Sequence, residues 1–117
     1  VLGVELPVST TIGPRLRLYH PHGIVLNPNC TLGSDCHLRH GVTVGNRVDR
    51  MGNEVGVASI GDYVELGAGC VVIGNVHVGD HARVGALAVV LDSVPAWGIV
   101  VGNPGRVIRV DEPDVQP

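Results

Sequence analysis

Histidines are the residues of this chain whose type and spacing best suit chemistry. Four of the six stand close together in the sequence, at positions 20, 22, 37 and 40. A neutral imidazole with a pKa near ~6.5 can accept a proton from a hydroxyl nucleophile, and it is also a good zinc ligand. The three cysteines offer less, because an odd number without a C-x-x-C pair suits neither a disulfide framework nor a zinc site. The pattern leaves general-base catalysis and zinc binding open at His20, His22, His37 and His40.

A six-residue repeat sets the elements that must position these histidines. Aliphatic side chains recur at every sixth residue in three runs, and a small or β-branched side chain mostly follows four residues later. This period fits neither an α-helix nor a simple hairpin; it predicts short strands joined by sharp corners, three to a coil, in a stacked parallel β-helix. Cys30, Cys36 and Cys70 all occupy the small-residue slot, so we expect them to fill the core. The aliphatic positions are Leu6, Ile12, Leu18, Leu26, Leu32, Leu38, Val44, Ile60, Leu66, Val72, Val78, Val84 and Val90.

Composition agrees with an all-β solenoid and excludes several classes of function. The chain has 117 residues, enough for one domain, and 44% hydrophobic residues but only 3% aromatic ones, with 17 glycines and 8 prolines. A net charge of −3 gives no positive field for nucleic acid or an anionic membrane. No apolar run reaches the ~18 residues of a membrane span, and no stretch is typical of a signal peptide. We expect one domain over residues 1–110 with a mobile tail over 111–117; the chain begins at Val1, which leaves a preceding domain open.

The two breaks in the period are where we expect functional residues, because a solenoid accommodates insertions only as loops. The first break holds His20 and His22, and the second holds a long polar loop over residues 45–59. Grouping the repeats in threes places the repeats that start at 18, 38, 66 and 84 above one another. The third residues of these four repeats then form one row, in which two histidines precede two alanines. We expect this row, a groove beside its alanines and the loop to share one edge. The row consists of His20, His40, Ala68 and Ala86.

Several stretches resemble a known family. The repeats, together with Val101-Gly102-Asn103-Pro104-Gly105-Arg106-Val107-Ile108, look like the hexapeptide-repeat acyltransferases. Gly3-Val4-Glu5-Leu6 and Leu18-Tyr19-His20-Pro21-His22-Gly23-Ile24-Val25 are similar to the serine acetyltransferase subgroup. The resemblance implies a left-handed β-helix, a catalytic His20 and a Glu5 carboxylate that orients its ring. Residues expected to bind the acceptor are Tyr19, His22, His40 and Arg50.

The sequence departs from that subgroup at two positions. The second active-site histidine of the family would fall on Val57 or Met51, and the aspartate before the catalytic histidine is replaced by Tyr19. In the family both positions serve recognition of the amino acid acceptor. The acceptor hydroxyl therefore stays open between a serine-like compound and a sugar or polysaccharide precursor.

The resemblance also implies the donor and the assembly. It predicts acetyl-CoA as acyl donor, a homotrimer with active sites between subunits and no bound metal. The cysteine usage indicates reduced thiols and so predicts a cytoplasmic location. The donor is expected to contact Gly45, Ala68, Gly85, Ala86, Gly102, Arg106 and Arg109. Two alternatives remain: a zinc-dependent β-helix of the carbonic anhydrase type, and a structural β-helix without catalysis.

Overall fold

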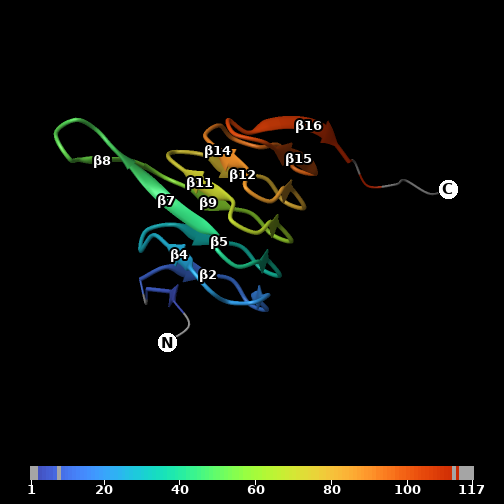
Figure 1. Ribbon diagram of the computed structural model, residues 1–117, viewed down its shortest axis with the longest axis horizontal. Helices are drawn as coiled ribbons and strands as arrows, with labels where there is room; N and C mark the ends of the chain where they lie inside the picture. The colour runs from blue at the N-terminus through green and yellow to red at the C-terminus, as the bar shows by residue number, and fades with distance from the viewer. Residues whose placement is uncertain (1–2, 8, 112, 114–117) are drawn as a thin grey trace.

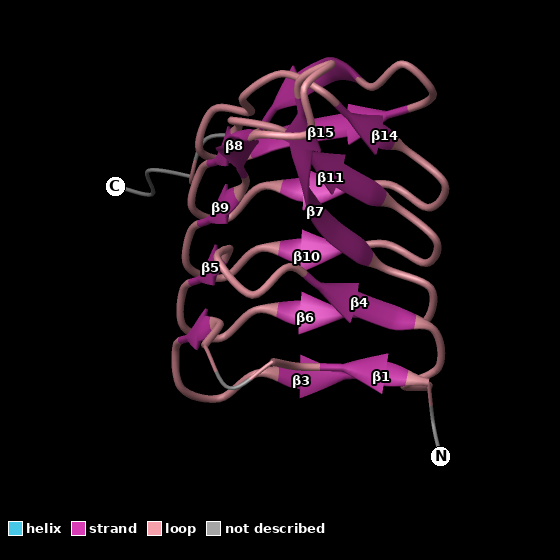
Figure 2. Cartoon of the chain, turned by 90° about the vertical axis from the view of Figure 1, so that its left-hand side faces the viewer, coloured by secondary structure: helices cyan, strands magenta, loops and turns pink. Residues whose placement is uncertain are grey.

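The computed structural model of the chain describes residues 3–7, 9–111 and 113, and within them sixteen strands and no helix. The strands wind around a three-sided prism whose coils stack along its length (Figures 1 and 2). No helix in these residues is long and apolar enough to cross a membrane. The expected parallel β-helix is confirmed. Residues 112 and 114–117 of the predicted tail lie outside the described part.

Each side of the prism is one parallel sheet, built from one short strand per coil. The first sheet holds β1 (Val4–Glu5), β4 (Ile24–Leu26), β7 (Thr43–Val48), β11 (Val71–Ile73) and β14 (Val89–Val90), with β8 (Glu54–Val57) antiparallel to β7. The second holds β2 (Thr11–Ile12), β5 (Thr31–Leu32), β9 (Ser59–Ile60) and β12 (His77–Val78). The third holds β3 (Arg17–Leu18), β6 (His37–Leu38), β10 (Glu65–Leu66), β13 (Arg83–Val84) and β15 (Gly98–Val101), with β16 (Arg106–Val110) antiparallel to β15.

The strand register confirms the grouping of repeats in threes. In the third sheet Leu18 pairs with Leu38, Leu38 with Leu66, and Leu66 with Val84. The repeat that begins at Leu18 therefore lies directly under those that begin at 38, 66 and 84. Figure 2 shows β3, β6 and β10 in one column, with β1 and β4 beside them.

The core is a set of aliphatic columns along the prism axis. Leu38, Val44 and Val72 are fully buried, and the free cysteines Cys30, Cys36 and Cys70 are buried among them, as expected. Each buried Leu or Val contributes roughly 1.5–3 kcal/mol, so a core without aromatic rings suffices when every coil repeats it. The first coil is less covered than the others: Leu6 is 39% exposed.

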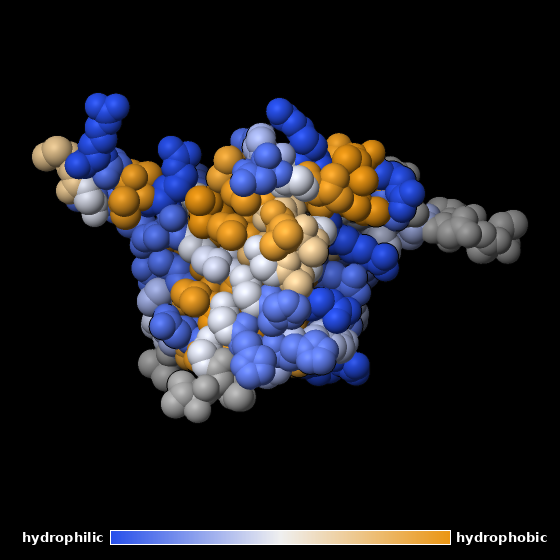
Figure 3. All heavy atoms as spheres, in the orientation of Figure 1, coloured by the Kyte–Doolittle hydropathy of each residue, from blue (hydrophilic) through white to orange (hydrophobic). Residues whose placement is uncertain are grey.

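The outward residues give the first and third sheets different surfaces. The outward positions of the third sheet are mostly charged, and we call this side the charged face: Arg17, His37, Glu65, Arg83 and Ile99. The outward positions of the first sheet are mostly apolar, and we call this side the apolar face: Glu5, Val25, Thr43, Val71 and Val89. In Figure 3 apolar atoms gather over the region of β11, β14 and β16.

Candidate active site

The predicted pair of histidines forms at the corner between the charged and the apolar face. The rings of His20 and His40 meet edge to face, with centroids 6.4 Å apart, and both side chains are exposed. His20 follows β3, and its left-handed φ of 50° begins a turn with two more residues than the corner above it. The turn closes where the backbone N–H of His22 donates to the carbonyl of His20 at 2.7 Å. Two imidazoles can therefore face the same bound molecule.

Backbone hydrogen bonds extend this row along the prism. The N–H of Gly41 donates to the carbonyl of His22, that of Gly69 to His40, and that of Leu87 to Ala68. His22 is thus the backbone counterpart of His40, while the ring of His20 reaches the ring of His40. Both histidines of the first turn, His20 and His22, therefore lie at the expected row. The row continues along the prism into Ala68 and Ala86.

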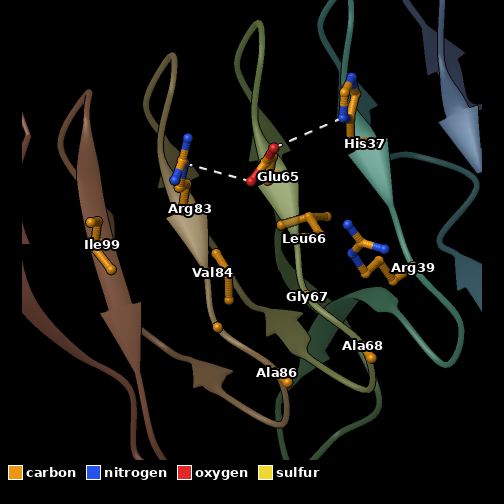
Figure 4. Close-up of a pocket in the computed structure, with 11 residues that line it drawn as sticks. His37, Arg39, Glu65, Leu66, Gly67, Ala68, Arg83, Val84, Ala86 and Ile99 are labelled. Carbon is orange, nitrogen blue, oxygen red and sulfur yellow. Dashed lines mark ion pairs between the residues drawn. The ribbon is translucent and has the colours of Figure 1, made fainter. Parts of the chain in front are cut away.

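A groove of about 360 Å³ borders the alanine part of the row, as expected, and Figure 4 shows its lining. Ala68, Gly85 and Ala86 form one wall together with Gly67. A Cβ on Gly67 would come within 2.7 Å of the backbone N of Ala86, so the coils can approach here only with glycine. Small residues leave room for an extended chain of methylene and amide groups along this wall.

The opposite wall of the groove is charged, and the sequence interpretation missed it. Glu65 lies 3.9 Å from Nδ1 of His37 and 3.5 Å from Nε of Arg83 (Figure 4). Arg39 completes this wall, with its guanidinium carbon 4.6 Å above the ring centre of Tyr19. A signal was present in the sequence, since His37, Glu65 and Arg83 each precede a core aliphatic residue and so had to point outward.

Glu5 lines a groove that includes neither His20 nor His40. It is exposed on β1, pairs in register with Val25, and lines a groove of about 410 Å³ on the apolar face together with Gly45. Gly3 of the same segment packs against Gly23, at the end of the turn that carries His20. Among the described residues, no hydrogen bond or ion pair joins Glu5 to a histidine.

The long loop is a β-hairpin, and it leaves the prism at another corner than expected. Strands β7 and β8 pair as far as Val48 and Glu54, and Figure 1 shows the hairpin projecting from the body. At its tip the carboxylate of Asp49 accepts hydrogen bonds from the backbone of Met51 and Asn53. His40 precedes the start of β7 at Thr43, whereas β7 pairs with β8 only from Asn46 onward, so the histidine corner and the hairpin lie at opposite ends of this strand. The expectation that the loop shares one edge of the prism with the histidine row is therefore wrong.

The remaining residues that were expected to bind the donor are only partly brought together. Gly102 and Arg106 flank the turn between β15 and β16, where the carbonyl of Gly102 accepts the N–H of Val89. Arg106 is exposed, whereas Arg109 is already held by Asp111, with Nε 2.6 Å from Oδ1. Gly45 lies on the apolar face, away from the alanine wall. Gly85, Ala68 and Ala86 are the expected donor contacts that share one groove.

The zinc alternative has no support in the arrangement of these side chains. Within residues 3–7, 9–111 and 113, no three His, Cys, Asp or Glu side chains group in a way that could hold a metal ion. Of the four histidines considered, His20 faces His40, whereas His37 turns to Tyr19 and Glu65 on the charged face.

The three stacked parallel sheets, wound from six-residue repeats, form the solenoid that the sequence resemblance implied. The family model described as "Bacterial transferase hexapeptide (six repeats)" matches residues 58–92 of the chain. WcaB of Escherichia coli K12, which its name assigns to acetyl transfer in colanic acid biosynthesis, is 43% identical over 106 residues, 90% of this chain and 63% of that protein.

Solved structures agree with this family. Serine acetyltransferase (CysE) of Neisseria gonorrhoeae superposes with a TM-score of 0.85 and 32% identity, over 92% of this chain and 41% of that one. A serine acetyltransferase in complex with CoA gives a TM-score of 0.76 and 30% identity, over 86% of this chain and 39% of that one. The expected resemblance and the left-handed β-helix are confirmed. The chain spans less than two thirds of the length of each of these relatives.

Proposed function

We propose that the chain is a CoA-dependent O-acetyltransferase that moves an acetyl group from acetyl-CoA to a hydroxyl of a small molecule. The observation that carries this proposal is the exposed pair of His20 and His40 in the row that continues into the alanine-lined groove. Relatives of the chain are named acetyltransferases, and one similar structure is a complex with CoA.

His20 is the general base of the proposed reaction. Its imidazole accepts the proton of the acceptor hydroxyl while the oxygen attacks the thioester carbonyl. The carbon–sulfur bond then breaks, and the imidazolium returns the proton to the thiolate of CoA. Glu5 is proposed as the carboxylate that orients and stabilises the protonated ring, supported by the contact of Gly3 with the His20 turn. Tyr19, His22 and His40 surround the hydroxyl of the acceptor.

The donor occupies the groove on the third sheet. The pantetheine arm lies along Ala68 and Ala86, where larger side chains would obstruct it, with Gly85 beside it. The nucleotide end extends toward Gly102 and Arg106, which is exposed and has no ion-pair partner among the described residues. Arg109 would have to give up Asp111 to bind a phosphate, so Arg106 is the better proposed contact.

The proposed assembly is a homotrimer that packs through the apolar face. Exposed aliphatic side chains on one side of a slender prism favour side-by-side contact with further copies. In that assembly the β7–β8 hairpin of one subunit, with Arg50 near its tip, reaches the histidine corner of a neighbour. Gly45, at the base of the hairpin, would then contact the donor from that neighbour. We place the protein in the cytoplasm, with which its three free thiols agree.

The test is release of free CoA from acetyl-CoA in the presence of hydroxyl acceptors, including L-serine and sugars. Wild-type protein should release CoA with at least one acceptor. His20→Ala should lower that rate by roughly 10²–10⁴, the usual contribution of a positioned base, and keep the circular dichroism spectrum and melting temperature of the wild type. Full activity in a folded His20→Ala protein, or no release with any acceptor, would refute the proposal.

A further inference from the structure

Two pairs of side chains stand next to each other across the first and second coils. Tyr19 and His20 are consecutive on the lower coil, and Arg39 and His40 are consecutive on the upper one. The guanidinium carbon of Arg39 lies 4.6 Å from the ring centre of Tyr19, and the rings of His20 and His40 are 6.4 Å apart. One residue of extended chain rises by about 3.3 Å. A cation is therefore held within the reach of one small molecule from the proposed base.

Among the residues that the structure describes, no carboxylate neutralises the charge of Arg39. Glu65 is the carboxylate of this wall, and it is already engaged by His37 and Arg83. In the described part of the chain, Arg39 has neither an ion pair nor a hydrogen bond to a carboxylate. The groove lining holds two arginines against one glutamate, although the chain as a whole carries a net charge of −3.

Tyr19 fixes the position of the arginine. Its ring lies under the guanidinium, its hydroxyl is 3.4 Å from Nδ1 of His37, and its side chain is half-buried. A cation over an aromatic ring is attracted to the ring face, and its N–H donors in the guanidinium plane stay available to a ligand. An arginine held in this way loses less conformational freedom when it binds a carboxylate or phosphate.

We propose that Arg39 on Tyr19 is an anion-binding subsite for the acceptor, whose hydroxyl then lies at His20. This inference rests on the proposed acetyl transfer and names its substrate class: a hydroxyl compound that carries a carboxylate or a phosphate close to the acetylated oxygen. A planar guanidinium binds either group through two parallel hydrogen bonds. The acceptor is thus an anionic hydroxyl compound and not a neutral one.

The position of Arg39 favours the acceptor over the diphosphate of the donor. The reacting thioester must lie at His20, and the whole pantetheine arm separates the thioester from the diphosphate of CoA. A cation one residue away from His40 is therefore too close to the reacting end to hold that diphosphate. It is well placed for a charged group on the molecule that supplies the hydroxyl.

Binding without the donor gives the first test. We would titrate the protein with glucuronate, glucose 6-phosphate, inorganic phosphate and glucose, and follow the ring proton signals of the histidines by NMR. The anions should shift the His20 and His40 signals and glucose should not. The carboxylate and phosphate arms distinguish the two anion types. Absence of any anion-induced shift, or an equal response to glucose, would overturn the proposal.

Variants make the test specific for Arg39. Arg39→Gln should weaken anion binding roughly tenfold to hundredfold, the size of a lost charge-assisted hydrogen bond, and Arg39→Lys should fall in between. Arg15→Gln is the matched control. It also removes one positive charge, but from a residue that pairs with Asp35 and does not belong to the proposed subsite. Anion binding that is unchanged in Arg39→Gln, or equally weakened in Arg15→Gln, would contradict an anion site at Arg39.

Kinetics separate this proposal from the proposed function. Arg39→Gln should raise the KM of a charged acceptor by roughly the same tenfold to hundredfold factor and leave the KM of acetyl-CoA unchanged. A rise in the acetyl-CoA KM alone would assign Arg39 to the donor site and overturn the inference. Anion binding without any acetyl transfer would refute only the proposed function. Transfer to neutral hydroxyls with no anion binding would refute only the subsite.

Discussion

The charged face and the apolar face share one inward pattern and differ in what they present outward. Leu38 and Leu66 fill the core behind the charged face, and Val44 and Val72 do the same behind the apolar face. One residue earlier in each strand, the charged face carries His37 and Glu65, and the apolar face carries Thr43 and Val71. The inward residue of each pair supports the coil, and the outward residue decides what that side can contact.

The inward residues therefore determine the fold, and the outward residues determine the function of each face. Any β-branched or leucine side chain serves inside, because each coil needs only an aliphatic residue of suitable volume. Outside, ion pairs such as Glu65 with Arg83 keep a surface open to solvent and ligand, whereas a row of valines favours contact with another apolar surface. The charged face therefore suits ligand binding, and the apolar face suits assembly.

The largest expected effect comes from changing an inward residue. Val72 is fully buried, so Val72→Asp places a carboxylate in a core with no partner, at a cost of several kcal/mol. That is comparable to the whole stability of a small domain, about 5–15 kcal/mol. We expect no folded protein by circular dichroism. The control is Val71→Asp, one residue earlier and outward, which should stay folded as a single subunit.

A smaller effect is expected on assembly and distinguishes the two faces directly. Val71→Asp adds charge to the apolar face and should reduce the mass in light scattering from that of the trimer to that of the monomer. Arg17→Asp makes a change on the charged face and should leave the mass at that of the trimer. If Arg17→Asp dissociated the trimer and Val71→Asp did not, the charged face and not the apolar face would form the contact between subunits. A wild-type protein that is monomeric would contradict assembly through either face.

Sequence alone predicts the fold because the period of six fixes which residues point inward, coil after coil. The row of His20 and His40 followed by Ala68 and Ala86 was predictable for the same reason, since stacking transmits register from one coil to the next. The two extra residues of the first turn, His20 and Pro21, put His22 at the backbone position beside His40, and the ring of His20 still reaches the ring of His40.

Other features of the candidate site depend on contacts that a period cannot show. Arg109 was expected to be available, but it is paired with Asp111, and such a pairing is a matter of side-chain conformation. The hairpin was expected beside His40 because both lie near Val44 in the sequence, yet a strand separates their corners. The cation of Arg39 over Tyr19 joins two coils and becomes visible only when both are built.

The smallest expected effect concerns the thiols inside the shared core. Burial raises the pKa of Cys70 to about 12, and it raises the pKa of Cys30 and Cys36 as well. The native state therefore keeps the Cys70 thiol protonated at a pH where the unfolded chain, with a thiol pKa near 9.0, ionises it. Below pH 9 the Cys70 thiol is protonated in both states, so its raised pKa does not change the free energy of unfolding. Above pH 9 ionisation of the thiol favours the unfolded state, so the free energy of unfolding falls between about pH 9 and 12.

Cys70→Ala should flatten this alkaline loss of stability, measured by urea unfolding at pH 8, 9 and 10. The small volume change adds only a modest constant cost, which a comparison of slopes removes. The same burial should keep all three cysteines unreactive toward a thiol reagent at pH 8 until denaturant is added, so that thiol detected during acetyl transfer would come from CoA. An identical pH slope in Cys70→Ala, or rapid labelling of the folded chain, would show that the coils open more readily than a closed aliphatic core allows.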